Sequence, residues 1–262
     1  MAHHADVISL TGVVRVYEGG QRALDGLTFT VPAGSICGFI GLNGAGKSTT
    51  IRLISGLEEA DGGLVDVLGE RVPFQDPRVK RRMGFVLDDP FYFDWLSARE
   101  YLVWIGRMEG LGAAESARRT DELLDVLSLP GDEGQLIRTF STGMKKKVSL
   151  AAAIIHAPEL LILDEPLEAV DAASARYIRD VLLSLARSGS TIFLTSHALD
   201  TVQRFCTELR IIHRGRMVLA CPTNQLAQAA RSVLGEATEG NLEDLFLRLV
   251  TGDAEHPRLS YV

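Results

Sequence analysis

The order of apolar and polar positions predicts strands towards both ends of the chain. Residues 7–17 are rich in β-branched side chains, and residues 27–34 alternate apolar and polar positions as a half-solvated strand does. Residues 35–41 and 84–89 are nearly continuous apolar runs, which is typical of strands buried on both faces of a parallel sheet. Residues 62–72 resemble a short hairpin.

The pattern turns helical between about residues 91 and 157, and then returns to strands. A helix is also expected directly after the strand at 35–41, where apolar residues gather on one side of residues 47–57. Later strands are predicted at 159–164, 190–196, 207–213 and 216–220. Residues 241–250 form a last amphipathic helix. We therefore expect one α/β domain over residues 1–222, with a helical subdomain inserted at about 91–157, and a short helical extension over 223–262.

Composition narrows the classes of function. The formal net charge of −7 over 262 residues argues against nucleic acid as the main partner, because a phosphate backbone calls for a basic surface. Cys37, Cys206 and Cys221 form no CxxC pair and no even set, so a reducing compartment is expected. Neither a signal peptide nor an apolar run of about 20 residues is visible. We expect a chain that is soluble by itself and reaches a membrane only through a partner.

The clearest motif is GLNGAGKST, at residues 41–49, which fits G-x-x-x-x-G-K-[ST] at every fixed position. Its glycines let backbone N–H groups point at phosphates, Lys47 supplies a positive charge to the β- and γ-phosphates, and the Ser48 hydroxyl can ligate Mg²⁺. A buried strand precedes the loop and a helix follows it, which makes an ordinary glycine-rich turn a poor alternative.

Two acids end a later apolar strand in the segment ELLILDEP. Asp164 is placed to hold Mg²⁺, and Glu165 follows it, where a carboxylate can orient or deprotonate an attacking water. A strand merely capped by acids is common, but the phosphate loop in the same chain favours the functional interpretation. No guanine-reading NKxD motif is evident, which favours ATP.

A second anion site is indicated by FSTGMKKK, at residues 140–147. Ser141 and Gly143 precede an expected helix, whose N-terminus carries unpaired N–H groups and a partial positive charge, with three lysines behind them. An ordinary serine N-cap is the alternative, and the two roles are compatible.

The segments GLNGAGKST, FSTGMKKK, ELLILDEP and TSH, in this order, resemble the nucleotide-binding subunit of ABC transporters over roughly residues 7–220. The resemblance implies an α/β fold with a P-loop NTPase core, an N-terminal antiparallel β subdomain and the inserted helices. It also implies two copies packed head to tail around two ATP molecules. Ser141 and the N–H of Gly143 would then contact the γ-phosphate that the other subunit's phosphate loop holds.

The same resemblance assigns further roles, one residue at a time. Tyr17 matches the aromatic residue that stacks on adenine, although a plain strand-end tyrosine is the alternative. His197 matches the switch histidine that contacts the γ-phosphate, and Asp171 matches an aspartate that communicates across the dimer. Asp88 stands where a glutamine usually touches Mg²⁺ and the attacking water. The remaining nucleotide contacts implied for the phosphate loop are those of Gly41, Asn43, Gly44, Ala45, Gly46 and Thr49.

Four departures from the family pattern stand out. The signature reads FSTGM instead of LSGGQ, Asp88 replaces the glutamine, EAVD replaces GLD, and Leu167 replaces a threonine. Asp88 adds a negative charge beside the γ-phosphate, so an active but slow ATPase is expected. A simple turn formed by Asp88 and Asp89 before Pro90 is the competing interpretation.

The resemblance implies an ATPase subunit of the bacterial exporter branch, at the cytoplasmic face of the membrane. Its implied partners are a membrane permease and an identical second subunit. Some of the aromatic side chains at Phe91, Phe93, Trp95 and Trp104 would line a groove for the permease, and others would be core. The alternatives are a soluble ABC ATPase, or a regulator that binds ATP and turns it over slowly.

Overall fold

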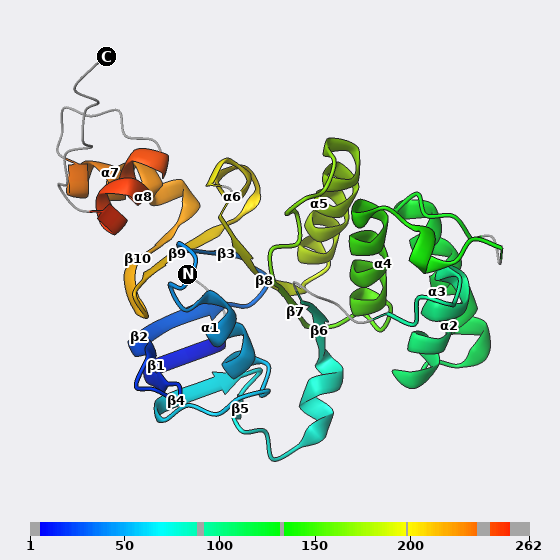
Figure 1. Ribbon diagram of the computed structural model, residues 1–262, viewed down its shortest axis with the longest axis horizontal. Helices are drawn as coiled ribbons and strands as arrows, with labels where there is room; N and C mark the ends of the chain where they lie inside the picture. The colour runs from blue at the N-terminus through cyan, green and yellow to red at the C-terminus, as the bar shows by residue number, and fades with distance from the viewer. Residues whose placement is uncertain (1–5, 88–91, 132–133, 198, 235–241, 252–262) are drawn as a thin grey trace.

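The computed structural model describes residues 6–87, 92–131, 134–197, 199–234 and 242–251. Two sheets organise this part of the chain (Figure 1). A four-stranded antiparallel sheet has the order β2-β1-β4-β5, and a six-stranded sheet has the order β10-β9-β3-β8-β7-β6. The predicted α/β class with an N-terminal antiparallel subdomain is confirmed.

The antiparallel sheet is built from the alternating segments near the N-terminus. Its strands are β1 (Asp6–Val16), β2 (Arg22–Pro32), β4 (Gly62–Val67) and β5 (Glu70–Arg71). Strand β1 pairs with β2 on one side and with β4 on the other, and its buried positions include Ile8 and Leu10. The alternation of buried and open positions is the pattern of a sheet with one face on the core.

The six-stranded sheet carries the continuous apolar runs. Its strands are β3 (Ile36–Ile40), β6 (Met83–Val86), β7 (Leu160–Leu163), β8 (Thr191–Ser196), β9 (Glu208–His213) and β10 (Arg216–Pro222). The pairs among β6, β7, β8, β3 and β9 are parallel, and β10 closes one edge antiparallel to β9. Every residue of β3, β7 and β8 is buried, as expected for strands covered on both faces.

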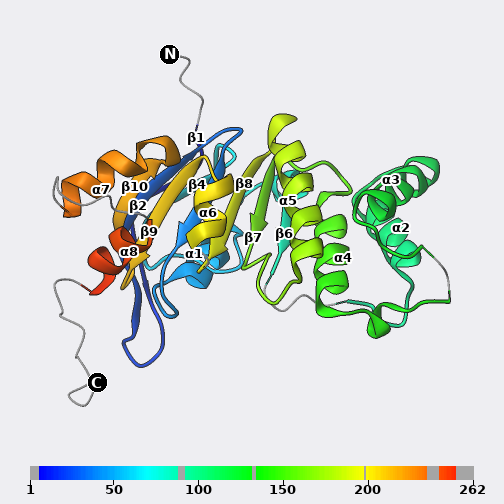
Figure 2. The ribbon, with the colours of Figure 1, turned by 90° about the horizontal axis from the view of Figure 1, so that it is seen from above.

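Helices flank the sheets and form the insertion. They are α1 (Lys47–Ile54), α2 (Ala98–Met108), α3 (Ala113–Val126), α4 (Thr142–Ile154), α5 (Ala172–Arg187), α6 (Leu199–Phe205), α7 (Leu226–Leu234) and α8 (Leu242–Thr251). Figures 1 and 2 show α2 and α3 at the end of the molecule opposite the antiparallel sheet. A capping box between Ser97 and Glu100 starts α2, because each closes an unpaired N–H group of the other.

Three short 3₁₀ helices complete the described elements, at Pro77–Arg82, Ile137–Thr139 and Thr223–Gln225. The helix bounds predicted for residues 47–57 and 241–250 agree with α1 and α8 to within a turn at each end. None of the helices in the described ranges is long and apolar enough to cross a membrane.

The C-terminal helices share the main core. Leu226 and Ala230 of α7 and Leu242, Leu245 and Phe246 of α8 belong to one hydrophobic cluster with the central strands. In Figure 1 these helices lie beside β10, away from the helical insertion. The division of the chain at residue 222 stays a prediction.

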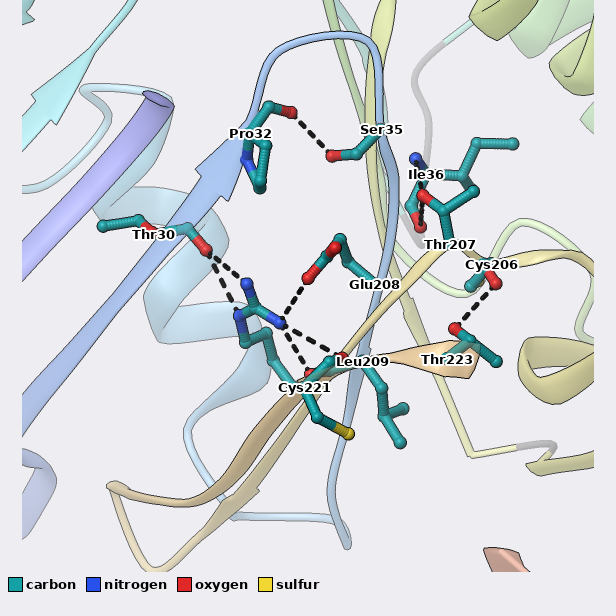
Figure 3. A network of polar contacts seen from close by, with 11 residues as sticks. Thr30, Pro32, Ser35, Ile36, Cys206, Thr207, Glu208, Leu209, Cys221 and Thr223 are labelled. Carbon is teal, nitrogen blue, oxygen red and sulfur yellow. Dashed lines mark hydrogen bonds and ion pairs between the residues drawn. The ribbon is translucent and has the colours of Figure 1, made fainter. Parts of the chain in front are cut away.

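One buried arginine, Arg210, joins the two sheets. Figure 3 shows the four residues whose oxygens accept its hydrogen bonds, Thr30, Glu208, Leu209 and Cys221. The Arg210 guanidinium on β9 donates to the Thr30 carbonyl oxygen of β2 at 2.9 Å and to a Glu208 carboxylate oxygen at 2.9 Å. It also donates to the carbonyl oxygens of Leu209 and Cys221. Its planar fork of donors suits such a cluster of acceptors, which fixes the antiparallel sheet against the six-stranded sheet.

Candidate active site

The phosphate loop runs from the end of β3 to the first turn of α1. Gly46, the N-cap residue of α1, has a φ of 112°, and a Cβ there would lie 2.7 Å from Leu24 and 2.8 Å from the Ala23 carbonyl oxygen. Both the left-handed backbone and the close approach require glycine. The loop therefore curls as the motif predicts, with α1 directed away from it.

Two loop residues that were predicted to contact nucleotide, Gly41 and Ala45, pack against the protein interior. A Cβ on Gly41 would lie 2.6 Å from the Ile212 carbonyl oxygen of β9, so this glycine allows the loop to approach the sheet. The Ala45 side chain is 4% exposed and packs into the core. The Ala45 N–H donates to the Leu42 carbonyl oxygen at 3.0 Å, and the Ala45 carbonyl oxygen accepts from the Gly215 N–H at 2.9 Å. Contacts of Gly41 and Ala45 with nucleotide stay predictions.

Lys47 is the central cation of the site. Its side chain is 8% exposed, and its Nζ donates to the Gly41 carbonyl oxygen at 2.8 Å. The same nitrogen lies 3.7 Å from a carboxylate oxygen of Glu165. Ser48, the next residue, is exposed beside it. A buried lysine next to an exposed hydroxyl at a helix N-terminus forms a site for an anion and its counter-ion.

The two acids after β7 are held by a threonine on the neighbouring strand. The Thr195 hydroxyl donates to Asp164 Oδ1 at 2.6 Å and accepts from the Glu165 backbone N–H at 2.9 Å. Glu165 has a φ of 46°, which turns the chain sharply at the strand end. Thr195 therefore positions both acids, a role that sequence reasoning missed because the contact spans 31 residues.

His197 and Glu168 complete this edge of the sheet. The Nδ1 atom of His197, which follows β8, lies 3.1 Å from a Glu165 carboxylate oxygen, so the predicted base and the predicted switch residue are in contact. Glu168 places a carboxylate oxygen within 4.8 Å of ligand atoms of both residues. Sequence reasoning did not single out Glu168, although its place three residues after Glu165 put it near the site.

These groups surround a hollow of about 660 Å³. Its lining residues are Leu42, Asn43, Lys47, Ser48, Asp164, Glu165, Glu168 and His197. The Ser48 hydroxyl and the Asp164 carboxylate are oxygen donors of the kind that Mg²⁺ prefers. Thr195 engages only Oδ1 of Asp164, which leaves Oδ2 for a metal or its water. The donor set therefore fits Mg²⁺.

A second hollow of about 270 Å³ continues from the first and contains Tyr17. Both hollows are lined by Leu42, Asn43, Lys47 and Ser48, and the second adds Gly44, Thr49 and residues 21–23. Tyr17 is half-buried, and its hydroxyl lies 3.2 Å from Thr49 Oγ1. The structure thus brings Tyr17 beside the phosphate loop, where sequence reasoning placed an adenine-stacking residue.

The signature residues lie at a different place. Ser141 begins α4 as its N-cap, accepting from the Met144 N–H at 3.2 Å, so the capping role is confirmed. Asp171 caps α5 in the same way, accepting from the Ser174 N–H at 2.9 Å. Hydrogen bonding from Ser174 lowers the pKa of Asp171. A Cβ on Gly143 would lie 2.8 Å from Asp171 Oδ2. Ser141, Gly143 and Asp171 line neither of the two hollows.

Two of the three lysines behind the signature contact backbone carbonyl oxygens. Lys147 is 5% exposed and donates to the Leu127 carbonyl oxygen at 2.7 Å, and burial lowers its pKa. Lys146 donates to the Glu165 carbonyl oxygen at 2.8 Å. These two cations bind carbonyl oxygens of their own chain.

Asp88, predicted to ligate Mg²⁺ and to act in catalysis, lies outside the described residues, as do Asp89, Pro90 and Phe91. Its substitution for glutamine therefore keeps the status of a sequence prediction.

Comparison with known proteins agrees with this architecture. The family model described as "ABC transporter" matches residues 24–168. The daunorubicin/doxorubicin resistance ATP-binding protein DrrA of Streptomyces peucetius is 36% identical over 225 residues, which cover 86% of this chain and 68% of that protein. The bacitracin transport ATP-binding protein BcrA of Bacillus licheniformis is 34% identical over 229 residues, covering 87% and 74%.

A solved structure of an ATP-binding subunit of an ABC transporter has a TM-score of 0.83 at 30% identity, covering 93% of this chain and 99% of that one. A dimeric cassette in a post-hydrolysis state with ADP and Pi has a TM-score of 0.75 at 21% identity, covering 82% and 98%, and shares the fold. The fold and site define a P-loop ATPase. The chain belongs to the ABC transporter family, as an ATP-binding subunit.

Proposed function

We propose that this chain is the ATP-hydrolysing subunit of an exporter, working as a head-to-tail homodimer under a separate membrane permease. One observation carries the proposal: Lys47, Glu165 and His197 converge on one hollow, while the capped signature helix at Ser141 lies outside it. The hollow therefore holds one half of the expected catalytic site, and the signature helix forms the other half at a separate place on the chain. A second copy would supply the other half, which couples closure of the dimer to catalysis.

The chemistry of the half-site follows from its contacts. Lys47 would bind the β- and γ-phosphates of ATP, and Ser48 and Asp164 would hold Mg²⁺, which neutralises phosphate charge when bound. Glu165 would orient the attacking water and accept its proton, while His197, which contacts Glu165 at 3.1 Å, keeps the carboxylate directed at the γ-phosphate position. Tyr17 would stack on the base.

The names of the relatives, which are resistance, transport and export proteins, favour an export function. Besides DrrA and BcrA, the Nod factor export ATP-binding protein I of Sinorhizobium fredii is 38% identical over 212 residues, covering 81% of this chain and 62% of that protein. An exposed aromatic surface supplies a docking place for a permease: Trp95 is 57% and Trp104 41% exposed, and Phe93 packs edge-on against Trp104 with ring centroids 4.8 Å apart. Docking there would place the chain at the cytoplasmic face of the membrane.

Affinity purification of the tagged chain from detergent-solubilised native membranes tests the proposal. We expect a polytopic membrane protein to be recovered in roughly equal amount, and ATP turnover to rise in its presence. Recovery of ribosomes or repair factors would point to a soluble ABC machine. Turnover that stays slow with the membrane protein bound would point to a regulator.

A further inference from the structure

Charged and hydroxyl side chains contact Tyr17. Tyr17 directly follows β1. Its hydroxyl donates to Glu58 Oε2 at 3.0 Å and lies 3.2 Å from Thr49 Oγ1. Because a phenol has one proton and Glu58 takes it, the Thr49 hydroxyl is the donor to the Tyr17 oxygen. One residue in the first turn of α1 and one in the segment that follows α1 therefore hold the Tyr17 hydroxyl.

Arg15 covers the same tyrosine. Its guanidinium carbon lies 5.1 Å from the ring centroid, within the range of a cation–π contact, and its Nε donates to the same Glu58 oxygen at 3.2 Å. The Arg15 and Glu58 side chains are only 24% and 21% exposed, so water competes weakly for these contacts. A base stacked on Tyr17 would take the ring face that Arg15 leaves open.

Asp61 connects Arg15 to the backbone of β1. One of its carboxylate oxygens accepts from Arg15 Nη1 at 3.2 Å, and the other accepts from the Val16 N–H at 2.6 Å. Glu58 and Asp61 lie in the segment between α1 and β4, directly downstream of the phosphate-loop helix. The end of β1, next to Tyr17, is therefore fixed to the segment that follows the phosphate-loop helix.

We propose that Glu58, with Arg15, is a positioning residue that holds Tyr17 as the base-stacking platform, so that it sets affinity for the nucleoside part of ATP and leaves phosphate binding unchanged. This inference rests on the proposed function of Tyr17 in nucleotide binding. A ring held in place before binding loses less conformational freedom when the base stacks, and a displaced ring loses that advantage. Among the described residues, Glu58 makes no hydrogen bond to the phosphate-loop backbone, and its ion pairs are with Arg15 and Arg52. Its effect on base binding should therefore pass through the ring.

Calorimetric titration of the whole chain with Mg–ATP and with inorganic tripolyphosphate, which has no base, tests the inference. We expect Glu58→Ala to raise the Kd for ATP about three- to tenfold, the effect of losing one hydrogen bond of ordinary strength, and to change the Kd for tripolyphosphate less than about twofold. Glu58→Gln keeps an acceptor for the Tyr17 hydroxyl and should lie between wild type and Glu58→Ala. In steady-state assays KM should rise and kcat should stay within about twofold.

Two controls make the result specific. Glu59→Ala removes the same charge from the exposed neighbouring position and should leave both Kd values unchanged. Tyr17→Phe removes the hydroxyl and keeps the ring, and combining it with Glu58→Ala should give no more loss than the larger single effect, because both remove one interaction. Thermal unfolding of each variant checks that it is folded.

The possible outcomes separate the two claims. If wild type binds ATP no more tightly than tripolyphosphate, the stacking role of Tyr17 fails. Suppose that the wild type binds ATP more tightly than tripolyphosphate. If Glu58→Ala keeps the same preference for ATP, or if it weakens the binding of both ligands equally, the positioning role of Glu58 is overturned while nucleotide binding stands. Strictly additive losses in the double variant would also overturn it.

Discussion

The Nζ atom of Lys47 lies 3.7 Å from a carboxylate oxygen of Glu165, and both side chains are shielded, with 8% and 12% exposed. The predicted phosphate-binding cation and the predicted base thus contact one another across the hollow. A γ-phosphate bound by Lys47 would replace this contact. The carboxylate would then be repelled from the phosphate oxygens and left to bind the attacking water, held on its other side by His197.

Replacing the base should separate binding from turnover. We expect Glu165→Gln to lower ATP turnover by about 10²- to 10⁴-fold, because the amide cannot accept the proton of the attacking water. ATP affinity should stay equal or increase, since a negative charge beside the phosphates is lost, and an ATP-bound dimer should accumulate. Phosphate release and gel filtration with ATP measure the two effects.

Glu168→Gln is the comparison for this variant, because Glu168 lines the same hollow without a contact to Lys47 within ion-pair distance among the described residues. It should lower turnover far less. Turnover by Glu165→Gln at the wild-type rate would show that Glu165 is not the base.

The Thr195 hydroxyl should control the Mg²⁺ requirement. In Thr195→Val, Asp164 loses its 2.6 Å hydrogen bond and the Glu165 N–H loses its acceptor. We expect the Mg²⁺ concentration for half-maximal turnover to rise about tenfold, and the free energy of unfolding to fall by about 1–3 kcal/mol. Magnesium titration of the ATPase rate and chemical denaturation measure these changes.

Thr191→Val is the matched control on the same strand. Thr191 is 1% exposed, and its hydroxyl accepts from the Gly34 N–H at 2.9 Å, at the opposite end of β8. It should cost similar stability and leave the Mg²⁺ requirement unchanged. An equal shift in both variants would assign the effect to general loosening of the sheet.

Local patterns predicted much of this architecture, and contacts between distant segments account for what they missed. Apolar runs placed the buried strands, and the fixed spacing of Gly41, Gly46 and Lys47 located the phosphate loop. Spacing could not show that Thr195 joins the two acids, because that hydrogen bond links two strands that only the sheet order makes neighbours. The partners of Lys147 could not be predicted from spacing either, because they lie in a distant part of the chain, at the end of α3.

The three cysteines should be unreactive in the folded protein. All are buried free thiols, and burial raises the pKa of Cys37 to about 12 and the pKa values of Cys206 and Cys221 above their usual range. The thiolate is the reactive form, so labelling with a disulfide reagent at pH 8 should be slow in the native state and should reach three thiols per chain in denaturant. One rapidly reacting native thiol would contradict the packing described for these residues.

The signature helix should control dimerisation separately from nucleotide binding. A Cβ on Gly143 would lie 2.8 Å from Asp171 Oδ2 and 3.2 Å from Ser174 Oγ, so Gly143→Ala must displace the cap of α5 or the start of α4. Neither hollow includes these residues, so ATP binding by the single subunit should change less than about twofold. If the signature completes the site of a second copy, the displacement should remove the ATP-dependent dimer and lower turnover at least tenfold.

Light scattering with ATP, in a Glu165→Gln background, measures the dimer. Gly134→Ala is the control, because a Cβ there meets nothing within 4 Å. A Gly143→Ala protein that dimerises as well as its parent would place the dimer contact elsewhere.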